Sequence, residues 1–285
     1  MTEPRRHLSP GMQVQLDLGY VFGGLATFGQ RPFLTEPEPL DDWQPDAAII
    51  GAPFDIATTN RPGARFGPKA IRALAYETGT YNIDLDIEVF DHLELVDYGD
   101  AYCPHGQTEV SHANIRDRVH QVASRGIVPI TLGGDHSITW PAATAVADVH
   151  GYGNVGVVHF DAHADTADTI DGNLASHGTP IRRLIDSGAV PGDRFVQIGL
   201  RGYWPPADVF AWMKEQGMVW HTMHEIWERG MQAVIADAVA EALARADKLY
   251  ISIDIDCLDP AFAPGTGCLL YTSDAADDTQ FVGVG

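Results

Sequence analysis

The stretch VVHFDAHADT, residues 157–166, decides how the rest of the chain is interpreted. Its first four residues are largely apolar, as in a buried strand, and Asp161, His163 and Asp165 then follow at alternating positions. In an extended backbone, residues two apart lie on one face, so these three side chains project together. Neighbouring carboxylates repel one another and lose hydration unless a positive charge lies among them. The stretch therefore predicts a buried strand that ends at a site for a cation.

Outward from this strand, the chain alternates between strand-like and helix-like segments. Apolar runs predict strands at 47–53, 93–99, 127–134, 155–161, 194–200, 218–223 and 248–256. Helices are predicted between them at 68–79, 109–126, 138–151, 206–217 and 230–247. This alternation indicates an α/β fold with a mainly parallel sheet covered on both faces, where ligands bind beyond the carboxyl ends of the strands. Residues 1–44, rich in Pro, Gly and acids, predict an irregular arm, and no second domain is expected.

Composition limits the partners. The chain has 18 basic and 39 acidic residues and a formal net charge of −21, which argues against a nucleic-acid partner and suits a cationic ligand. No window approaches the length of a transmembrane span, so we expect no membrane partner. The 3 cysteines are too widely spaced for a zinc knuckle or a disulfide framework. A cytoplasmic location is the expectation.

Two further clusters of acids and histidine follow predicted strands. GGDHS supplies His136, and SIDIDCLDP supplies Asp254 and Asp256. A parallel sheet would bring all these side chains to one edge, where carboxylates with histidine suit Mn²⁺ better than Zn²⁺. Six ligands are too many for one ion and fit two ions that share carboxylates and make water nucleophilic. Lys and Arg are absent from residues 126–181 and 249–285, so the positive charge must come from elsewhere.

The motifs resemble the signature blocks of the ureohydrolase (arginase and agmatinase) family, and are most like those of agmatinases. The blocks are GGDHS, HFDAHADT, SHGTPIRR and SIDIDCLDPAFAPGTG, together with GAPFD and RPGARFGPKAIR, and the likeness runs from about residue 27 to residue 267. The resemblance implies a three-layer α/β/α fold, a catalytic domain over 45–267, two Mn²⁺ ions per chain, and hydrolysis of a guanidino group to urea and an amine. It also implies a homo-oligomer of unknown stoichiometry.

The resemblance further implies roles for individual residues. One manganese ion would be held by His136, Asp161, Asp165 and Asp254. The second would be held by Asp161, His163, Asp254 and Asp256, with Asp161 and Asp254 bridging the two ions. His177 matches the family histidine that passes a proton to the leaving amine, and Asp165 is placed with it as a catalytic residue. An imidazole titrates near neutral pH, so that role is chemically sensible.

The substrate is inferred from the loop TADTIDGNLAS, residues 166–176, which contains Asp168 and Asp171 and no basic residue. Such a loop favours a small cationic guanidino substrate, agmatine, which would give putrescine and urea. We expect Asp168 and Asp55 to contact it, although Asp55 could equally be an ordinary residue at a strand end. Another guanidino compound, such as 4-guanidinobutyrate, or a formimino compound stays open as an alternative substrate. A guanidino acid would need a nearby cation, and Arg61, Arg65 and Arg201 are more distant in the sequence.

The resemblance breaks after residue 267. The family continues with Thr-Pro-Glu, two glycines, a helix and a strand, whereas this chain reads CLLYTSDAADDTQFVGVG at 268–285. The first part of that segment resembles the translation of a transposase adapter used in sequencing libraries. We therefore expect a non-native tail that lacks the last strand and helix, and a chain that is poorly stable and weakly active. A non-catalytic metal-binding or assembly protein stays open as an alternative.

Overall fold

The computed structural model describes residues 24–75 and 79–266. The chain divides into two compact units, Met1–Ile56 with Pro62–Ile138, and Ala57–Arg61 with Thr139–Gly285. The predicted tail at 268–285 lies outside the described residues, and the single catalytic domain over 45–267 stays a prediction. Within the described residues, no helix has both the length and the apolar character needed to cross a membrane.

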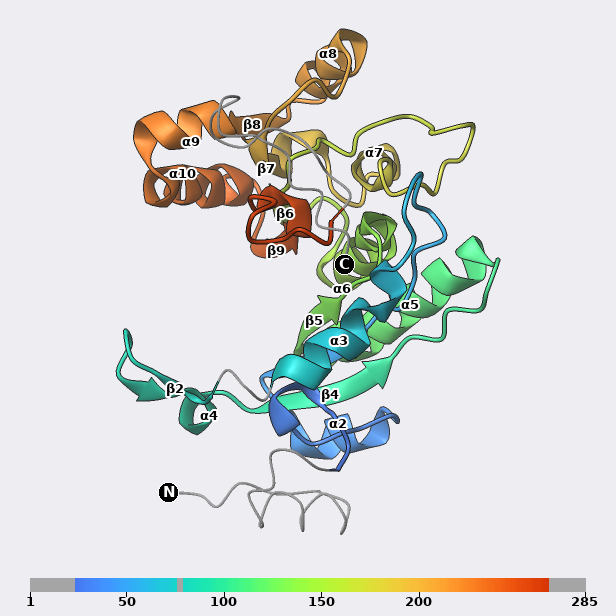
Figure 1. Cartoon of the computed structure of the whole chain (residues 1–285), viewed down its shortest axis with the longest axis vertical. Coiled ribbons are helices and arrows are strands. Elements are labelled where there is room, and N and C mark those ends of the chain that lie inside the picture. The colour runs from blue at the N-terminus through green and yellow to red at the C-terminus, as the bar shows by residue number, and fades with distance from the viewer. Residues whose placement is uncertain (1–23, 76–78, 267–285) are drawn as a thin grey trace. The chain divides into compact units, whose positions relative to one another are not determined.

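The first unit is built on a parallel sheet with the order β4-β1-β5, of which Figure 1 labels the outer strands β4 and β5. These strands span Leu95–Asp100, Ala47–Gly51 and Val128–Leu132. Every residue of the central strand β1 is buried, as expected for a strand with a neighbour on each side. Helices α3 (Gly67–Leu74) and α5 (Thr108–Ala123) pack against this sheet. A 3₁₀ turn, η2 (Ala64–Phe66), leads into α3.

The N-terminal arm is less irregular than its composition predicts. A 3₁₀ turn, η1 (Phe28–Gln30), precedes the helix α2 (Glu38–Trp43), which has a proline in its first turn and buries Leu40. Backbone hydrogen bonds fasten the arm to β4, since Leu34 donates to the Asp97 carbonyl at 2.8 Å. The prediction of an irregular arm was therefore wrong at residues 38–43, because burial of Leu40 and the acids of the first turn stabilise a helix there.

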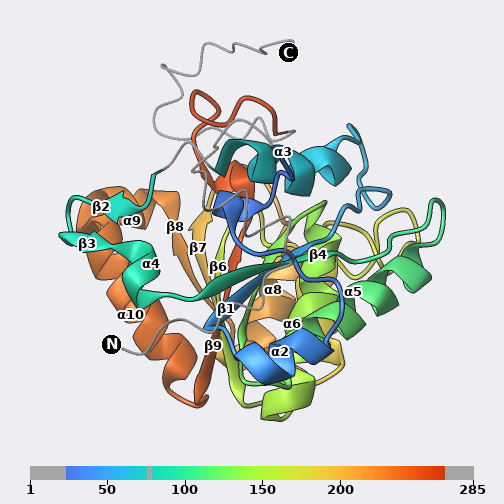
Figure 2. The same ribbon diagram turned by 90° about the horizontal axis from the view of Figure 1, so that it is seen from below.

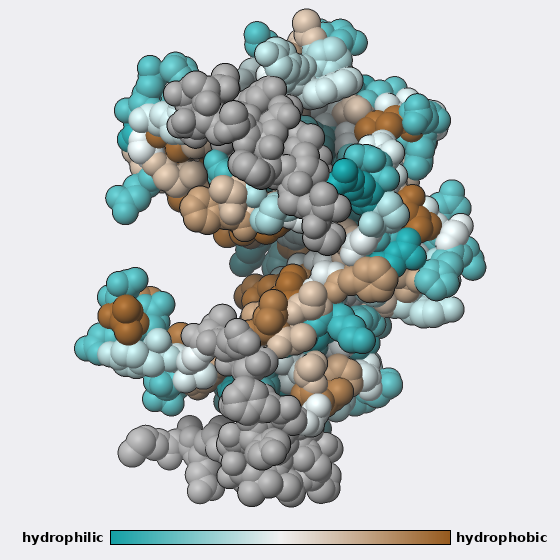
Figure 3. Space-filling model, in the orientation of Figure 1, coloured by the Kyte–Doolittle hydropathy of each residue, from teal (hydrophilic) through white to brown (hydrophobic). Residues whose placement is uncertain are grey.

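The first unit also carries a short hairpin that the sequence did not predict. Strands β2 (Tyr81–Asn82) and β3 (Ile87–Glu88) pair antiparallel and lead into α4 (Val89–His92). Ile83 and Leu85 in its turn are exposed, and Figure 3 shows hydrophobic surface on this hairpin. With only two residues in each strand, periodicity could not have identified it.

The second unit is built on a parallel sheet with the order β8-β7-β6-β9. The strands are β6 (Val155–Phe160), β7 (Phe195–Leu200), β8 (Val219–Thr222) and β9 (Lys248–Ile253). Helices α9 (Met223–Arg229) and α10 (Met231–Leu243) cover one face, where Val158 of β6 joins Val196, Ile198 and Val234 in an apolar core. Helices α6 (Thr139–His150) and α7 (Pro180–Asp186) lie on the other side, as Figure 2 shows for α6 and α10. Helix α8 is Ala207–Glu215, and η5 (Gly192–Arg194) precedes β7.

One glycine sets how closely helix and sheet approach in this unit. A Cβ placed on Gly156 of β6 would lie 2.2 Å from the carbonyl oxygen of Ala242 in α10. Only a residue without a side chain leaves room for that carbonyl. The backbone of α10 therefore rests directly on β6.

The predicted fold class is confirmed: the chain is α/β, and each of the seven predicted strands is present in a parallel sheet. The last strand ends at Ile253 instead of residue 256, because Asp254 caps a 3₁₀ turn, η6 (Ile255–Cys257). The five predicted helices correspond to α3, α5, α6, α8 and α10, whereas α7 and α9 were not predicted.

Candidate metal centre and active site

Two of the predicted clusters meet at the carboxyl edge of the second unit's sheet. Strands β6 and β9 are parallel neighbours in which Phe160 lies opposite Ile253. The next residue on each strand is an aspartate, and the Asp254 amide donates to the Phe160 carbonyl at 2.9 Å. Asp161 and Asp254 therefore leave the sheet side by side, as parallel pairing predicts.

A compact group of possible ligands forms at this edge. Asp161, His163 and Asp256 each offer one ligand atom, and these atoms lie within 4.8 Å of one another. His163 Nδ1 is 2.9 Å from Asp256 Oδ2 and 3.5 Å from Asp161 Oδ1. Both carboxylates are buried, whereas the His163 side chain is about a third exposed. Two buried carboxylates and an imidazole at this spacing are a donor set suited to a divalent cation.

The Asp256 carboxyl is held in its charged form. Burial alone would raise its pKa, but the His163 ring, a hydrogen bond involving Asp161 and the Ala162 amide together lower it well below its usual range. The Ala162 amide donates to Asp256 Oδ1 at 3.1 Å. A carboxylate that stays ionised while buried is the form that binds a cation.

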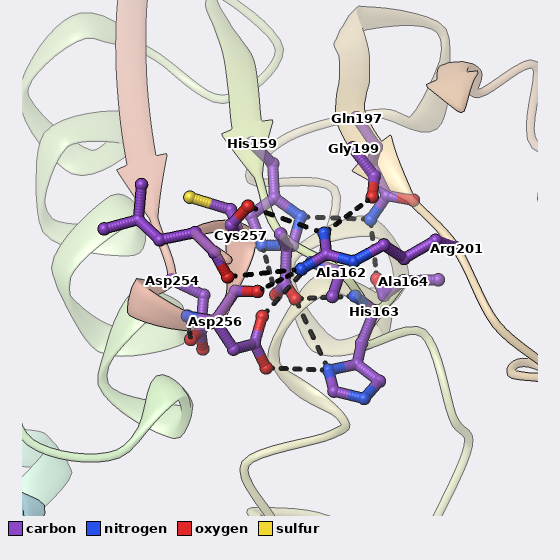
Figure 4. Close-up of polar contacts among 12 residues, drawn as sticks. His159, Ala162, His163, Ala164, Gln197, Gly199, Arg201, Asp254, Asp256 and Cys257 are labelled. Carbon is purple, nitrogen blue, oxygen red and sulfur yellow. Dashed lines mark hydrogen bonds and ion pairs between the residues drawn. The ribbon is translucent and has the colours of Figure 1, made fainter. Parts of the chain in front are cut away.

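Arg201 fixes the loop that carries Asp256. Its Nη2 donates to the Asp256 carbonyl at 2.7 Å, and its Nη1 donates to the Gly199 carbonyl at 3.2 Å (Figure 4). The Leu258 carbonyl also accepts from Nη2, at 3.3 Å. The guanidinium therefore holds backbone at the ends of β7 and β9, and the sequence had suggested it only as a distant cation for a guanidino acid.

Asp254 and Asp165 lie on the same loops but outside the compact group. Asp254 Oδ1 accepts from the Asp256 amide at 3.0 Å and so caps η6. Asp165 has a φ of 51°, in the left-handed region that aspartate tolerates better than most residues. Its carbonyl accepts from the Ile181 amide at 3.2 Å, which joins the Asp165 loop to α7.

His136 opens η4 (His136–Ile138) shortly after β5, in the first unit. The turn before it is held by Asp135, whose Oδ1 accepts from the Ser137 amide at 3.0 Å and from the Ser137 hydroxyl at 2.5 Å. The Asp135 amide donates to the Phe54 carbonyl at 2.7 Å. GGDHS is thus a turn with an aspartate cap, and the role of His136 as a ligand stays a prediction.

His177 is held by the segment at residues 57–59. Its amide donates to the Ala57 carbonyl at 3.1 Å, and the Ser176 hydroxyl donates to the same carbonyl at 3.2 Å. The His177 ring Nε2 lies 3.1 Å from the Thr59 hydroxyl. Backbone and ring are therefore both fixed by one short segment, which the sequence did not single out.

The two predicted substrate contacts already have protein partners. Asp168 is 70 % exposed, and its Oδ1 accepts from Arg183 Nη2 of α7 at 2.9 Å. Asp55 is buried, and its carboxylate accepts from the Gly63 amide at 2.6 Å and from Arg65 Nε at 2.5 Å. Burial would raise the pKa of Asp55, but the Arg65 side chain and the amides of Arg65 and Gly63 lower it overall. Asp55 thus organises its own loop, and contact with a substrate stays a prediction for both residues.

His159 is a residue of the site that the sequence analysis missed. Its Nε2 lies 2.9 Å from Asp161 Oδ2, and its Nδ1 lies 3.0 Å from Gln197 Nε2. The signal was present in the sequence, since His159 extends the alternating row of Asp161, His163 and Asp165 by one step towards the N-terminus.

Comparison with known proteins identifies relatives over most of the chain. The model of the Arginase family matches residues 45–270. A guanidinobutyrase of Pseudomonas aeruginosa is 39 % identical over 246 residues, which is 86 % of this chain and 75 % of that protein. A mitochondrial agmatinase of Gallus gallus is 42 % identical over 246 residues, which is 86 % of this chain and 69 % of that protein.

Solved structures share the fold. Proclavaminate amidinohydrolase from Streptomyces clavuligerus superposes with a TM-score of 0.76 at 34 % identity, over 87 % of this chain and 79 % of that one. A formiminoglutamase of Trypanosoma cruzi, solved with Mn²⁺, superposes with a TM-score of 0.72 at 28 % identity, over 79 % of this chain and 75 % of that one.

Proposed function

Because the chain belongs to the arginase family, we propose that it hydrolyses the guanidino group of agmatine to putrescine and urea with two Mn²⁺ ions per chain. The observation that carries this proposal is the compact group of Asp161, His163 and Asp256, with possible ligand atoms within 4.8 Å of one another. Support also comes from the absence of Lys and Arg in residues 126–181 and 249–285. Without a basic side chain in their own segments, the buried carboxylates of Asp161 and Asp256 favour a metal ion as the source of positive charge.

The residues proposed to hold the two ions are those with hard oxygen or imidazole donors: His136, Asp161, His163, Asp165, Asp254 and Asp256. When bound, the ions would act as Lewis acids and make water nucleophilic near neutral pH. The amides of His163 and Ala162 donate to Asp161 and Asp256 and orient these two carboxylates.

His177 is proposed to carry a proton during hydrolysis. Water oxygen forms a bond to the guanidino carbon, the bond from that carbon to the alkyl nitrogen breaks, and the departing amine takes up a proton. An imidazole can take up and release a proton, so the His177 ring is the group proposed to deliver that proton. Its contact with the Thr59 hydroxyl supports a fixed ring orientation. Asp165 is proposed to orient the attacking water.

A second substrate class is favoured by one contact. The loop with Asp168 and Asp171 supports a cationic substrate such as agmatine, but Arg183 already pairs with Asp168 at 2.9 Å. Arg183 would supply the cation that the carboxylate of a guanidino acid needs, and one similar protein is a guanidinobutyrase. A guanidino acid such as 4-guanidinobutyrate is therefore the second candidate.

Urea release by the full chain with Mn²⁺ separates the candidates. Faster turnover of agmatine than of 4-guanidinobutyrate supports the proposal, and the reverse order overturns it in favour of the guanidino acid. If the acid is the substrate, Arg183→Gln should raise its KM about 10-fold or more, because a charged hydrogen bond contributes about 1.5–3 kcal/mol. The KM for agmatine should not rise in this variant. Binding of Mn²⁺ without urea from either compound would indicate a non-catalytic metal-binding protein.

A further inference from the structure

We propose that His159 and Gln197 form a positioning relay that holds the Asp161 carboxylate in the orientation required by a metal ion. This inference rests on the proposed metal site and adds two residues that need not touch metal or substrate. His159 and Gln197 are fully buried, and His159 Nε2 lies 2.9 Å from Asp161 Oδ2. Two polar side chains at complete burial need a compensating role in hydrogen bonding.

Strand register brings the two residues together. His159 of β6 lies directly opposite Gln197 of the parallel strand β7, so their side chains share one face of the sheet. The preceding residue, Val158, faces the apolar core under α10, so the relay lies on the opposite face of the sheet. Figure 4 shows the Gln197 amide and the His159 ring in contact at the ends of these strands.

The hydrogen bonds of Gln197 define the tautomer of His159. Gln197 Nε2 lies 2.6 Å from the Ala164 carbonyl and 3.0 Å from His159 Nδ1. A carbonyl only accepts, so the amide nitrogen must face Ala164, and its second hydrogen points to His159. Nδ1 is then the acceptor, and Nε2, which lies 2.9 Å from Asp161 Oδ2, carries the ring hydrogen.

Asp161 is consequently approached by a nitrogen on each of its oxygens. The His163 amide donates to Oδ1 at 2.6 Å, and His159 Nε2 faces Oδ2. A carboxylate oxygen has more than one lone pair, so each oxygen can still bind a cation. Donors of this kind fix the direction in which a carboxylate presents its remaining lone pairs, and they affect metal affinity without touching the metal.

Mn²⁺ binding to the full 285-residue chain tests the relay, with affinity measured by calorimetry and the paramagnetic resonance spectrum of bound Mn²⁺ as a second readout. His159→Phe keeps the ring volume and removes the donor, and Gln197→Met removes the group that sets the tautomer. Each should weaken Mn²⁺ binding by about 10–100-fold. His159→Gln places an amide N–H near the position of Nε2 and should recover part of the affinity.

His221→Gln is the matched control, because His221 is also a buried histidine on a strand of this sheet but pairs with Glu225 and Glu241. It should leave Mn²⁺ affinity unchanged. The relay is overturned if His159→Phe and Gln197→Met bind Mn²⁺ like the unsubstituted chain, or if His221→Gln weakens binding equally. An unsubstituted chain that binds no Mn²⁺ would overturn the metal centre itself, and the relay with it.

Discussion

At the scale of single residues, the first unit contains a buried ion pair with two-point geometry. Arg72 Nε and Nη2 donate to the two oxygens of Asp97 at 2.7 and 2.9 Å, and Asp97 is fully buried. The Phe28 amide also donates to Asp97 Oδ2, at 2.8 Å. This carboxylate therefore joins α3, β4 and the N-terminal arm, so its loss should affect more than one element.

Asp97→Asn should lower the free energy of unfolding by about 1.5–3 kcal/mol, because it weakens two charged hydrogen bonds to the buried Arg72 guanidinium, which keeps Asp100 as its other carboxylate partner. Urea unfolding monitored by circular dichroism measures this. The control is Asp41→Asn, since Asp41 makes the same two-point contact with Arg125 at an exposed position. That exposed pair should contribute about 0–1 kcal/mol. Equal losses in the two variants would contradict the prediction.

Thr59 should act on catalysis through His177. Thr59→Val removes the hydroxyl that lies 3.1 Å from His177 Nε2 and keeps the shape of the side chain. With the ring less well oriented, kcat for urea release should fall about 10-fold while KM stays nearly constant. Thr59→Ser retains the hydroxyl and should behave like the unsubstituted chain. A loss confined to KM would instead place Thr59 against the substrate.

Single side chains were predictable where spacing along one strand carried the information. The alternation of Asp161 and His163 identified two members of the compact ligand group directly. The partners of Asp168 and Asp55 were not predictable in this way, because Arg183 and Arg65 come from a helix 15 residues away and a turn 10 residues away. A loop that looks purely acidic in the sequence can therefore carry a balanced charge in the fold.

At the scale of elements, strand β8 and helices α9 and α10 meet at the buried side chain of His221. His221 Nδ1 is 3.0 Å from Glu225 of α9, and its Nε2 is 3.0 Å from Glu241 of α10. Burial would lower the pKa of His221, but the two carboxylates raise it overall. Arg229 also pairs with Glu225 at 2.5 Å and so competes for that carboxylate.

A histidine with a raised pKa in the folded state stabilises the protein below its unfolded pKa of about 6.5, and this contribution is lost as pH rises through the folded value. The stability advantage of the unsubstituted chain over His221→Gln should thus be largest near pH 6 and shrink towards pH 9. Thermal unfolding across this range measures it. His224→Gln, at an exposed position of α9, should show no such trend. A constant difference between the unsubstituted chain and His221→Gln would contradict the assignment.

Strand β9 presents an apolar outer edge. In the described part of the chain, β9 pairs only with β6, and Ile251 and Ile253 are 56 % and 67 % exposed. Such an edge promotes pairing between molecules, and a lysine on it opposes that pairing. Ile253→Lys should reduce concentration-dependent light scattering of the chain. Leu243→Lys, on an exposed position of α10, is the control. Equal reductions would indicate an effect of net charge alone.

Elements were predicted best where their hydrophobic pattern was long. The strands β1 and β4 to β9 follow apolar runs, and their existence and type needed no tertiary information. The boundary between β8 and α9 was missed, although Thr222 and Glu225 form the start of a capping box in which the Thr222 hydroxyl accepts from the Glu225 amide at 3.3 Å. Helix α2 was missed because burial of Leu40, and not its short sequence, stabilises it.

At the scale of the whole molecule, metal binding should contribute to stability because the net charge of −21 includes carboxylates gathered at one sheet edge. Mn²⁺ at about 100 times its dissociation constant should add about 2.7 kcal/mol to the free energy of unfolding. The melting temperature should rise by several degrees and return to its starting value with a chelator. Asp161→Asn should abolish this rise, whereas Asp117→Asn on α5 should preserve it. A similar rise in both variants would point to nonspecific binding.

The family and the fold class could be predicted for the whole molecule because the motifs occur in order at strand ends. The substrate could not be predicted in the same way, because the loop with Asp168 looks purely acidic in the sequence, whereas Asp168 pairs with Arg183 in the fold. The division into two compact units could not be predicted from the sequence either, because apolar strands alternate with helices in both units and no change of composition separates them.

The absence of a side chain at Gly156 determines the distance between strand β6 and the helix α10 that covers it. Any larger residue there would push the Ala242 carbonyl and the C-terminal half of α10 outward. It would also separate Val158 from Val234 in the apolar core between the helix and the sheet. The same strand ends one residue before Asp161, so tilting β6 to relieve the clash would misdirect the carboxylate. Substitutions on the outer surface of α10 should therefore change the free energy of unfolding little. The absence of a side chain at position 156, by contrast, determines how closely α10 approaches β6.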